Sequence, residues 1–450
     1  METKKSKQIS SAHYALNQPL PEFALDSTQS YLFHQIETTR NSYFIQGQAG
    51  TGKSTFIRYL QTHSRKKIRI TCPTALAATH IGGVTLHSLF QLPLKDFFIL
   101  EELELKRQTA SILRRTDILV IDEASMVRPD MLDAIDYLCR KARGNLMPFG
   151  GMQIVLVGDL CQLPPVIKVS TYPIFRAKYG YAESYFFDSS AFKQGNFTTI
   201  ILTQVYRQND TNLLRHLINL RHNRHINDAI AFFNQAQFTN KEAYDTAVTI
   251  TPYKATAEQI NHTRLVSLPG ELMTFKAEIS GHFKQITEMP APKLLSLKEG
   301  ALVIFNKNNP PLWINGSTGI ILHLDREMIW VQLIKDNKVV PVKRETWESY
   351  VYQYVKERDE VIEKLNGRFT QFPLQLGYAL TIHKAQGKTL DKVIIDMNRG
   401  AFAHGQLYVA LSRTRSYHDI HLTNHLSPED IIMDPRVLTF LRSQISLSSG

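Results

Sequence analysis

Cysteine is scarce in this sequence: Cys72, Cys139 and Cys161 are the three cysteines among 450 residues. They lie far apart and are odd in number, and no pair has the spacing of metal ligands. A disulfide-stapled fold and a cysteine metal site are therefore excluded. We expect the protein to work in a reducing compartment, where thiols stay free.

Long hydrophobic runs are also missing. No apolar stretch approaches the ~20 residues of a membrane-spanning helix, and the N-terminal residues lack the apolar segment of a secretory signal. We therefore expect no membrane partner, a flexible basic arm at residues 1–22, and a cytoplasmic (nucleoid-associated) location if the source is prokaryotic. Internal repeats and low-complexity blocks are absent too, which excludes a solenoid.

Acidic residues are outnumbered by basic ones, 41 to 52, which gives a net charge of +11. This excess favours a polyanionic partner, most simply nucleic acid. A basic protein without such a partner is the alternative, since charge alone does not identify a ligand. A chain of this length can form two or three domains with full cores.

Apolar runs alternate with helical patterns from about residue 30 to 200. Several runs are continuously apolar, as is typical of parallel strands buried on both faces, and we predict α/β layers. The predicted strands are 43–46, 68–72, 118–122, 153–157 and 199–203, and the same pattern returns at 246–251 and 392–396.

Residues 292–345 have a different pattern, in which short strands alternate with Asn, Gly and Asp turns. The strands predicted here are 301–305, 319–324, 329–334 and 338–342. Short strands joined by tight turns favour a small antiparallel barrel. The charged stretch from Glu345 to Leu365 that follows is predicted to be helical.

The segment from Gly47 to Ser54, Gly-Gln-Ala-Gly-Thr-Gly-Lys-Ser, fits the phosphate-loop pattern G-x-x-x-x-G-K-[ST]. A strand-like run precedes it and a helical pattern follows it. Glycines let backbone N–H groups turn toward an anion, and the helix start adds partial positive charge. Lys53 can reach terminal phosphates and the Ser54 hydroxyl can bind Mg²⁺. A glycine-rich turn without nucleotide is disfavoured by this context.

Two further strand ends carry polar residues. One apolar run ends at Asp122 and Glu123, and the next leads through a Gly-Asp turn to Gln162. The carboxyl ends of parallel strands share one edge of a sheet, beside the phosphate loop. Asp122 is placed to hold the Mg²⁺ shell, Glu123 to polarise the attacking water, and the Gln162 amide to sense the γ-phosphate. A polar turn after a strand is ordinary by itself, but the two turns together with the phosphate loop favour a site for nucleotide hydrolysis.

Arg207 and Arg413 lie outside the first α/β unit. An arginine supplied by a second domain stabilises transition-state charge, is worth roughly 10³–10⁵ in rate, and makes hydrolysis depend on closure of the cleft. Upstream, Gln29 follows three residues that can cap a helix, and its amide can bind the edge of adenine.

In this order, these residues resemble those of superfamily 1 DNA helicases that move 5′-to-3′, and in particular the petite-integration-frequency (PIF) helicase family. Two stretches beyond the ATPase motifs carry the resemblance, Met131 to Gln153 and Tyr378 to Thr389. The resemblance covers about residues 23 to 424. It implies ATP and Mg²⁺ as ligands and an α/β fold with two RecA-like P-loop motor domains, a small wedge insertion in the first and an SH3-like β-barrel insertion in the second.

The implied domain boundaries follow from this architecture. They are motor domain 1 at 23–190, with a candidate wedge at 91–115; motor domain 2 at 191–291 and 366–430; the SH3-like insertion at 292–365; and a C-terminal tail at 431–450.

The resemblance also assigns residues to roles. The catalytic residues are Lys53, Asp122, Glu123, Gln162, Arg207 and Arg413. The nucleotide-binding residues are Gln29, Gly47, Ala49, Gly50, Thr51, Gly52, Lys53, Ser54, Thr55 and Gly387, and the metal is held by Ser54 and Asp122. The DNA-binding residues are Pro73, Thr74, His80, Thr85, His87, Phe90, Pro164, Val166, Thr381, His383, Lys384 and Gln386. Hydroxyls suit phosphate contacts and aromatic rings suit stacked bases, with core packing the alternative for Phe90.

The resulting hypothesis is an ATP-dependent 5′-to-3′ DNA helicase and single-stranded DNA translocase that is monomeric without DNA. Its expected partners are single-stranded and forked duplex DNA, with G-quadruplex DNA and RNA–DNA hybrids as further candidates. Three alternatives stay open: a RecD-like subunit of a nuclease complex, an ATP-driven clamp or remodeller that separates no strands, and a small-molecule kinase or GTPase. The last has no need for the motifs at 378–389 and 406–413.

Overall fold

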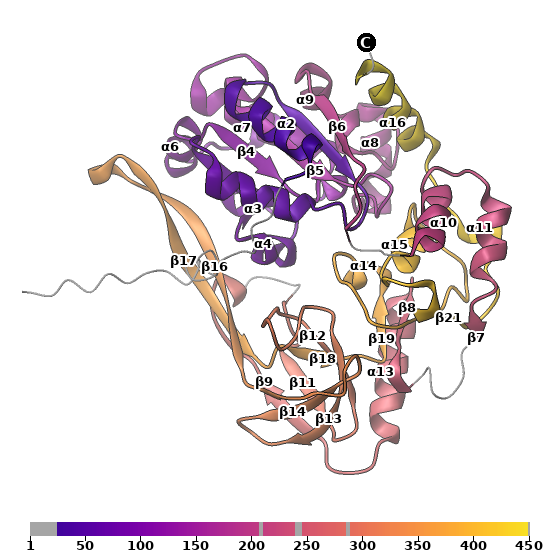
Figure 1. Cartoon of the computed structure of the whole chain (residues 1–450). Coiled ribbons are helices and arrows are strands. Elements are labelled where there is room, and N and C mark those ends of the chain that lie inside the picture. The colour runs from indigo at the N-terminus through magenta and orange to yellow at the C-terminus, as the bar shows by residue number, and fades with distance from the viewer. Residues whose placement is uncertain (1–24, 207–209, 239–244, 285–288, 449–450) are drawn as a thin grey trace, which may run out of the picture.

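The computed structural model describes residues 25–206, 210–238, 245–284 and 289–448. Two α/β domains lie beside each other, and an antiparallel β unit extends from the second (Figure 1). The predicted basic arm at residues 1–22 lies outside the described residues. Within the described part of the chain, no helix is long and apolar enough to cross a membrane.

The first domain is built on a six-stranded parallel sheet with the order β3-β2-β4-β5-β1-β6. Every residue of β1, β4 and β5 is buried, as their continuously apolar sequences predict. The strands are β1 (Tyr43–Gly47), β2 (Ile68–Cys72), β3 (Val84–Thr85), β4 (Ile118–Ile121), β5 (Gln153–Gly158) and β6 (Thr198–Leu202).

Helices cover both faces of this sheet, because successive side chains of a strand point to opposite faces. Tyr43 and Ile45 pack in the cluster that holds α2 and α3, whereas Phe44 packs in the cluster that holds α7. The helices of the domain are α2 (Ser27–Thr38), α3 (Lys53–His63), α4 (Ala75–Ile81), α5 (Leu86–Phe90), α6 (Arg107–Arg114), α7 (Pro129–Arg143), α8 (Tyr172–Tyr179) and α9 (Ser190–Gln194).

The second domain has a five-stranded parallel sheet with the order β19-β8-β20-β21-β7. Its strands are β7 (Gln237–Phe238), β8 (Val248–Thr251), β19 (Ala379–Thr381), β20 (Val393–Ile395) and β21 (Ile420–Leu422). The helices that follow β6 are α10 (Thr211–Arg221), α11 (Ile226–Phe233), α13 (Lys254–Ser267), α14 (Ile382–Ala385), α15 (Gln406–Leu411) and α16 (Pro435–Ser448).

Between β8 and β19, the chain forms a five-stranded antiparallel sheet with its own core, which includes Phe305, Trp313 and Val331. All four strands predicted in this region are confirmed, and the SH3-like character of the unit stays a prediction. The strands are β12 (Leu302–Phe305), β13 (Thr318–Leu324), β14 (Ile329–Leu333), β15 (Val339–Val342) and β18 (Leu374–Leu376). Outside this sheet lie β9 (Met273–Lys276), β10 (Glu278–Gly281) and β11 (Leu294–Leu297).

The prediction of a helix from Glu345 to Leu365 was wrong. This stretch forms a long antiparallel hairpin of β16 (Glu345–Val355) and β17 (Glu360–Gln371), which turns at Asp359 with a φ of 52°. The physical reason is the content of β-branched and aromatic residues in β16, which favours a strand over a helix.

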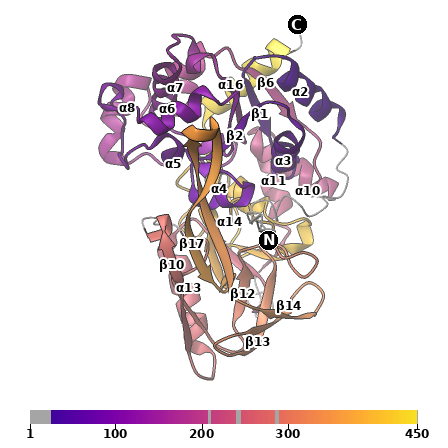
Figure 2. The same cartoon turned by 90° about the vertical axis from the view of Figure 1, so that its left-hand side faces the viewer.

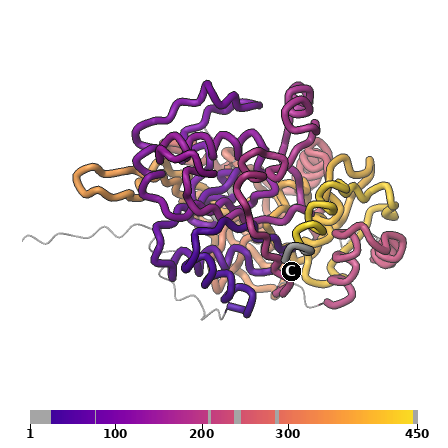
Figure 3. Tube along the Cα trace, turned by 90° about the horizontal axis from the view of Figure 1, so that it is seen from above, coloured from indigo at the N-terminus to yellow at the C-terminus, as the bar shows by residue number. Residues whose placement is uncertain are grey.

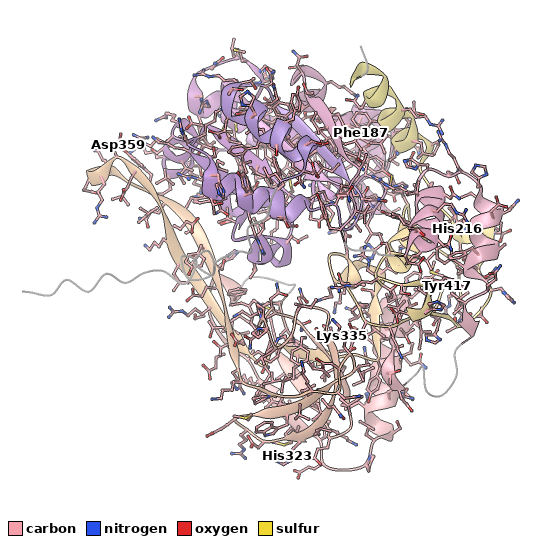
Figure 4. The ribbon with its side chains drawn as sticks, in the orientation of Figure 1. Phe187, His216, His323, Lys335, Asp359 and Tyr417 are labelled. Atoms are coloured by element: carbon pink, nitrogen blue, oxygen red, sulfur yellow. The ribbon has the colours of Figure 1, made fainter. Side chains whose placement is uncertain are left out.

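The hairpin runs from the antiparallel unit to the first domain (Figures 1 and 2). Seen from above, its tip projects at one side of the molecule (Figure 3). The Ile70 N–H donates to the Tyr352 hydroxyl at 3.3 Å, and Arg115 Nε donates to Asp359 at 2.8 Å. Figure 4 shows Asp359 at the tip and His323 at the opposite end of the unit.

Two segments differ from the expected boundaries. Strand β6 pairs with β1, so the first sheet extends beyond residue 190. The C-terminal helix α16 packs on the first domain, where Phe440 stacks on Phe187 at 4.5 Å between ring centroids. The candidate wedge at 91–115 places Phe98 and Leu103 in the main core, so it folds together with the first domain.

Candidate ATP site and strand-binding surface

The phosphate loop connects β1 to α3 at the carboxyl edge of the first sheet. Gly50 and Gly52 have φ values of 84° and 77°, which favour glycine. A Cβ at Gly47 would lie 2.4 Å from Thr51 Oγ1, so this position also requires glycine. The Lys53 ammonium donates to the carbonyl oxygens of Gly47 and Gln48 at 2.7 and 2.9 Å. The loop therefore holds a cation beside backbone N–H groups, as a phosphate site requires.

The remaining predicted nucleotide contacts flank this loop. Ser54 is exposed, Ala49 is buried, and Thr55 is half-buried at the start of α3. Gln29 lies against the loop, with its Nε2 atom 3.0 Å from the position that a Cβ of Gly52 would take. The same residue completes the capping box of α2 with Asp26, so the capping interpretation holds as well.

Tyr206 lies over the loop and was not predicted. Its N–H donates to Gly50 O at 2.8 Å, and its hydroxyl donates to Asp26 at 3.0 Å. The ring is 54% exposed, which leaves a face on which an adenine can stack. The neighbouring Arg207 lies outside the described residues. The signal that could have revealed Tyr206 was its place directly before this arginine.

The acid pair follows β4, as predicted. Asp122 accepts a hydrogen bond from the Glu123 N–H at 2.9 Å. Glu123 has a left-handed backbone with a φ of 52°, an uncommon conformation for a residue other than glycine and one that clusters at functional sites. Gln386 of the second domain donates from Nε2 to Glu123 Oε2 at 3.3 Å. The pair therefore faces the cleft between the domains.

Burial sets the electrostatics of this site. Burial and then the charge of Glu123 raise the pKa of Asp122 to about 7. Burial also raises the pKa of Glu123, against the charge of Lys53, the hydrogen bond from Gln386 and the charge of Arg413. Burial lowers the pKa of Lys53 despite the nearby carboxylates. Each group lacks full compensation of its charge, so the site fits an anion at Lys53 and a cation at the acids.

Gln162 lies in the loop after β5 and is 7% exposed. Its amide Nε2 donates to Asp159 Oδ2 at 3.2 Å, which fixes the side chain beside the acid pair's strand. Pro164 is half-buried and Val166 is 68% exposed, so Val166 stands at the surface of the same loop.

The second domain contributes α14 and α15 to the cleft. Arg413 is 1% exposed, and its guanidinium donates to Val409 O at 2.7 Å and to Ser412 Oγ at 2.7 Å. The charge of Arg413 acts on Glu123, although its hydrogen bonds fix it within its own domain. Gly387 has a φ of 78° and open space around it, next to Gln386.

Three predicted DNA contacts share one local geometry. Thr74, Thr85 and Thr381 are the N-caps of α4, α5 and α14, and each hydroxyl accepts a hydrogen bond from the N–H three residues later, at 3.1 to 3.3 Å. A capping hydroxyl still has its own hydrogen to donate. Each site therefore joins an O–H donor to the positive end of a helix, which suits a phosphate.

The other predicted contacts differ in exposure. Pro73 and His87 are half-buried, and His383 and Lys384 are exposed on α14. His80 lies in α4, but its side chain is not among the described ones. The assignment of Phe90 to base stacking was wrong, because its ring is 1% exposed and packs in the main core. In a short helix, the pattern of apolar residues does not show whether an aromatic ring lies in the core or on the surface.

Known DNA helicases resemble this chain over most of its length. The sequence model of the PIF1-like helicases matches residues 24–227. The ATP-dependent DNA helicase Pif1 of Bdellovibrio bacteriovorus is 30% identical over 433 residues, which cover 94% of this chain and 93% of that one. The chain belongs to the PIF1-like helicase family.

Solved structures of the family have the same fold. Bacteroides Pif1 in complex with ADP-AlF4 is 33% identical with a TM-score of 0.86, covering 94% of this chain and 98% of that one. Bacteroides Pif1 bound to ssDNA is equally similar in sequence and covers 95% and 98%, but its TM-score is 0.69. Since identity and coverage match, the lower score reflects a different arrangement of the same parts. Unliganded Bacteroides Pif1 has a TM-score of 0.85, so this chain adopts an arrangement closer to that of the two structures without DNA than to that of the ssDNA complex.

Proposed function

We propose that this ATP-dependent DNA helicase steps 5′-to-3′ along one DNA strand and separates forked duplex. The hydrogen bond from Gln386 to Glu123 supports the proposal most directly. Gln386 ends the same short helix that carries His383 and Lys384 and is capped by Thr381. A DNA strand bound on α14 would therefore be linked, through the Gln386 amide, to the Glu123 carboxylate that is placed to activate water.

In the proposed reaction, the first domain supplies the chemistry. Lys53 exchanges its two carbonyl partners for the terminal phosphates of ATP, which restores the charge compensation that burial denies it. Glu123 accepts a proton from the attacking water, a role helped by its raised pKa.

Mg²⁺ fits this site through Ser54 and Asp122 and would neutralise charge on the phosphates. Among the described residues, no group of three or more His, Cys, Asp or Glu side chains could hold a metal ion by itself. Mg²⁺ commonly combines one or two carboxylates with substrate phosphates, which agrees with a buried acid pair whose negative charge Lys53 compensates only in part.

The proposed step uses two grips on the strand. Thr74 and Thr85 belong to the first domain and Thr381 to the second, with ATP between them. Closure on ATP shifts one grip toward the other, and hydrolysis releases it. Separating a base-pair step costs about 1.4 kcal/mol on average, so net unwinding needs coupling to ATP.

Unwinding of duplexes with a 5′ or a 3′ single-stranded tail tests activity and polarity together. We expect ATP-dependent strand separation of the 5′-tailed duplex only, and none with Lys53→Ala. Separation of the 3′-tailed duplex would reverse the proposed polarity. Hydrolysis that DNA stimulates without any strand separation would instead favour a clamp or remodeller.

The proposal extends to further substrates and to the state of the free protein. G-quadruplex DNA and RNA–DNA hybrids are candidate substrates, because translocation along one strand displaces whatever is paired with it; displacement assays on each test this. We also propose a monomer without DNA, testable by light scattering. Free, buried Cys72, Cys139 and Cys161 agree with a reducing, cytoplasmic location, testable by cell fractionation.

A further inference from the structure

The Asp159 carboxylate is a buried junction between the two motor domains. Asp159 is 1% exposed, and its two carboxylate oxygens accept hydrogen bonds from five groups among the described residues. Oδ1 accepts from Gln46 Nε2 at 2.9 Å, Arg221 Nη2 at 3.0 Å and Cys161 N at 3.2 Å, and Oδ2 accepts from Gln162 Nε2 at 3.2 Å and Tyr408 OH at 3.4 Å.

These donors come from both sides of the cleft. Gln46 and Gln162 belong to the first domain, whereas Arg221 ends α10 and Tyr408 lies in α15 of the second. Arg221 is only 6% exposed, so its charge is buried against a loop of the other domain. Burial disfavours the ionised form of Asp159, but the charges of Arg221 and Lys53, together with the hydrogen bonds from Gln162 and Cys161, outweigh it and hold its pKa below the ordinary value.

The same loop is fixed by a second set of contacts. His404 Nδ1 accepts from the Asp434 N–H at 2.8 Å, so its Nε2 carries the proton and donates to Leu160 O at 2.8 Å. A Cβ at Gly405 would lie 2.5 Å from Cys161 O, so only glycine permits this contact. The backbone of residues 160–162 therefore follows the second domain closely.

We infer that Arg221 is a positioning residue that ties the Gln162 amide to the second domain through Asp159. Gln162 and Arg221 share this one carboxylate, so a shift of α10 changes the hydrogen bonding that orients the amide. The inference rests on the proposed function and on the role that the sequence predicts for Gln162, which is to sense the γ-phosphate. It adds an interdomain contact on the first domain's sensor that is separate from Arg207 and Arg413.

The ratio of ATP hydrolysis with saturating oligo(dT) to hydrolysis without it tests this inference. The ratio does not depend on the fraction of folded enzyme, so a merely structural role leaves it unchanged. We expect Arg221→Gln to lower the ratio about fivefold or more, taking the lower end of the range for coupling between binding sites as a guide. The KM for ATP should change less than about threefold, because the substitution affects the coupling of DNA binding to hydrolysis and not the ground-state binding of ATP. Arg221→Lys should give an intermediate ratio.

Arg224→Gln is the matched control, since Arg224 is exposed three residues further along the chain. A ratio within twofold of wild type in folded Arg221→Gln overturns the inference while the proposed function stands. If Arg221→Gln does not fold, Arg221→Lys decides, because it keeps the charge but not the guanidinium geometry; a wild-type ratio there also overturns the inference. If oligo(dT) does not change the rate of ATP hydrolysis by the wild-type protein, the proposed function is rejected, and the inference with it.

Discussion

Replacing Asp122 by Asn should stabilise the nucleotide-free protein while it abolishes hydrolysis. The Asp122 side chain is 8% exposed, and burial together with the charge of Glu123 raises its pKa from 3.8 to about 7. A shift of about three units corresponds to about 4 kcal/mol at 1.36 kcal/mol per unit. Asn keeps the shape and removes the charge, so we expect a gain of up to about 4 kcal/mol in the free energy of unfolding above pH 7.

The pH dependence gives this prediction its sign. The folded-state pKa of Asp122 lies above its unfolded value, so the native state binds more protons between about pH 4 and 7 and loses stability as the pH rises. Asn has no such proton. The advantage of Asp122→Asn in thermal unfolding midpoint should therefore be small near pH 4 and largest above pH 7.

An exposed carboxylate, Glu101, provides the control, because Glu101→Gln should show no such pH-dependent advantage. Unfolding scans of the three proteins across this range, without nucleotide, make the measurement. Equal midpoints for wild type and Asp122→Asn above pH 7, or an advantage that does not vary with pH, would refute the assignment of Asp122 as a buried acid whose charge is only partly compensated. Added Mg²⁺ and ATP should raise the midpoint of wild type more than that of the variant.

Three other perturbations probe separate parts of the molecule. Lys53→Ala should nearly abolish hydrolysis and leave single-strand binding intact, measured by phosphate release and fluorescence anisotropy; normal turnover would contradict the phosphate-loop assignment. Arg413→Ala should reduce turnover more than ATP affinity, in a variant whose unfolding midpoint is checked because the native side chain is buried; equal losses would indicate a ground-state contact only. Arg115→Ala removes an ion pair with Asp359 together with a hydrogen bond to the Tyr354 hydroxyl and a cation–π contact with its ring, so stability should fall by about 1 to 2 kcal/mol. Proteolysis at the hairpin tip, residues 356–360, should become faster; an unchanged cleavage rate would mean that Arg115 does not hold the hairpin.

Local patterns in the sequence predicted 11 of the 21 strands in the described part of the chain. The predicted strands of both sheets and of the antiparallel unit are confirmed within a few residues, because continuous or alternating apolar runs reflect burial directly. The helix prediction from Glu345 to Leu365 failed because it relied on the charges of this segment, although the β-branched and aromatic residues of β16 favour a strand. The prediction that Phe90 stacks on bases failed because the exposure of a side chain depends on which distant residues pack over it.

The candidate site divides in the same way. Gly47 to Ser54, Asp122, Glu123 and Gln162 were predictable, because each sits at the end of an apolar strand and parallel strands bring those ends to one edge. The contact of Gln46 with Asp159 had a sequence signal, because a polar amide is unusual within a continuously buried strand. The contact of Arg221 had none, since an arginine in the last turn of a helix is ordinary.

The sequence by itself determined the chemistry of this protein: a phosphate loop, an acid pair and a sensor amide, each encoded by neighbours along the chain. Only the tertiary structure decided which groups of the second domain touch them. Gln386 meets Glu123 across 263 positions and Arg221 meets Asp159 across 62, and the hairpin reaches Ile70 from Tyr352 across 282. Such contacts depend on how the two domains pack together, and packing between surfaces distant in sequence follows no local period.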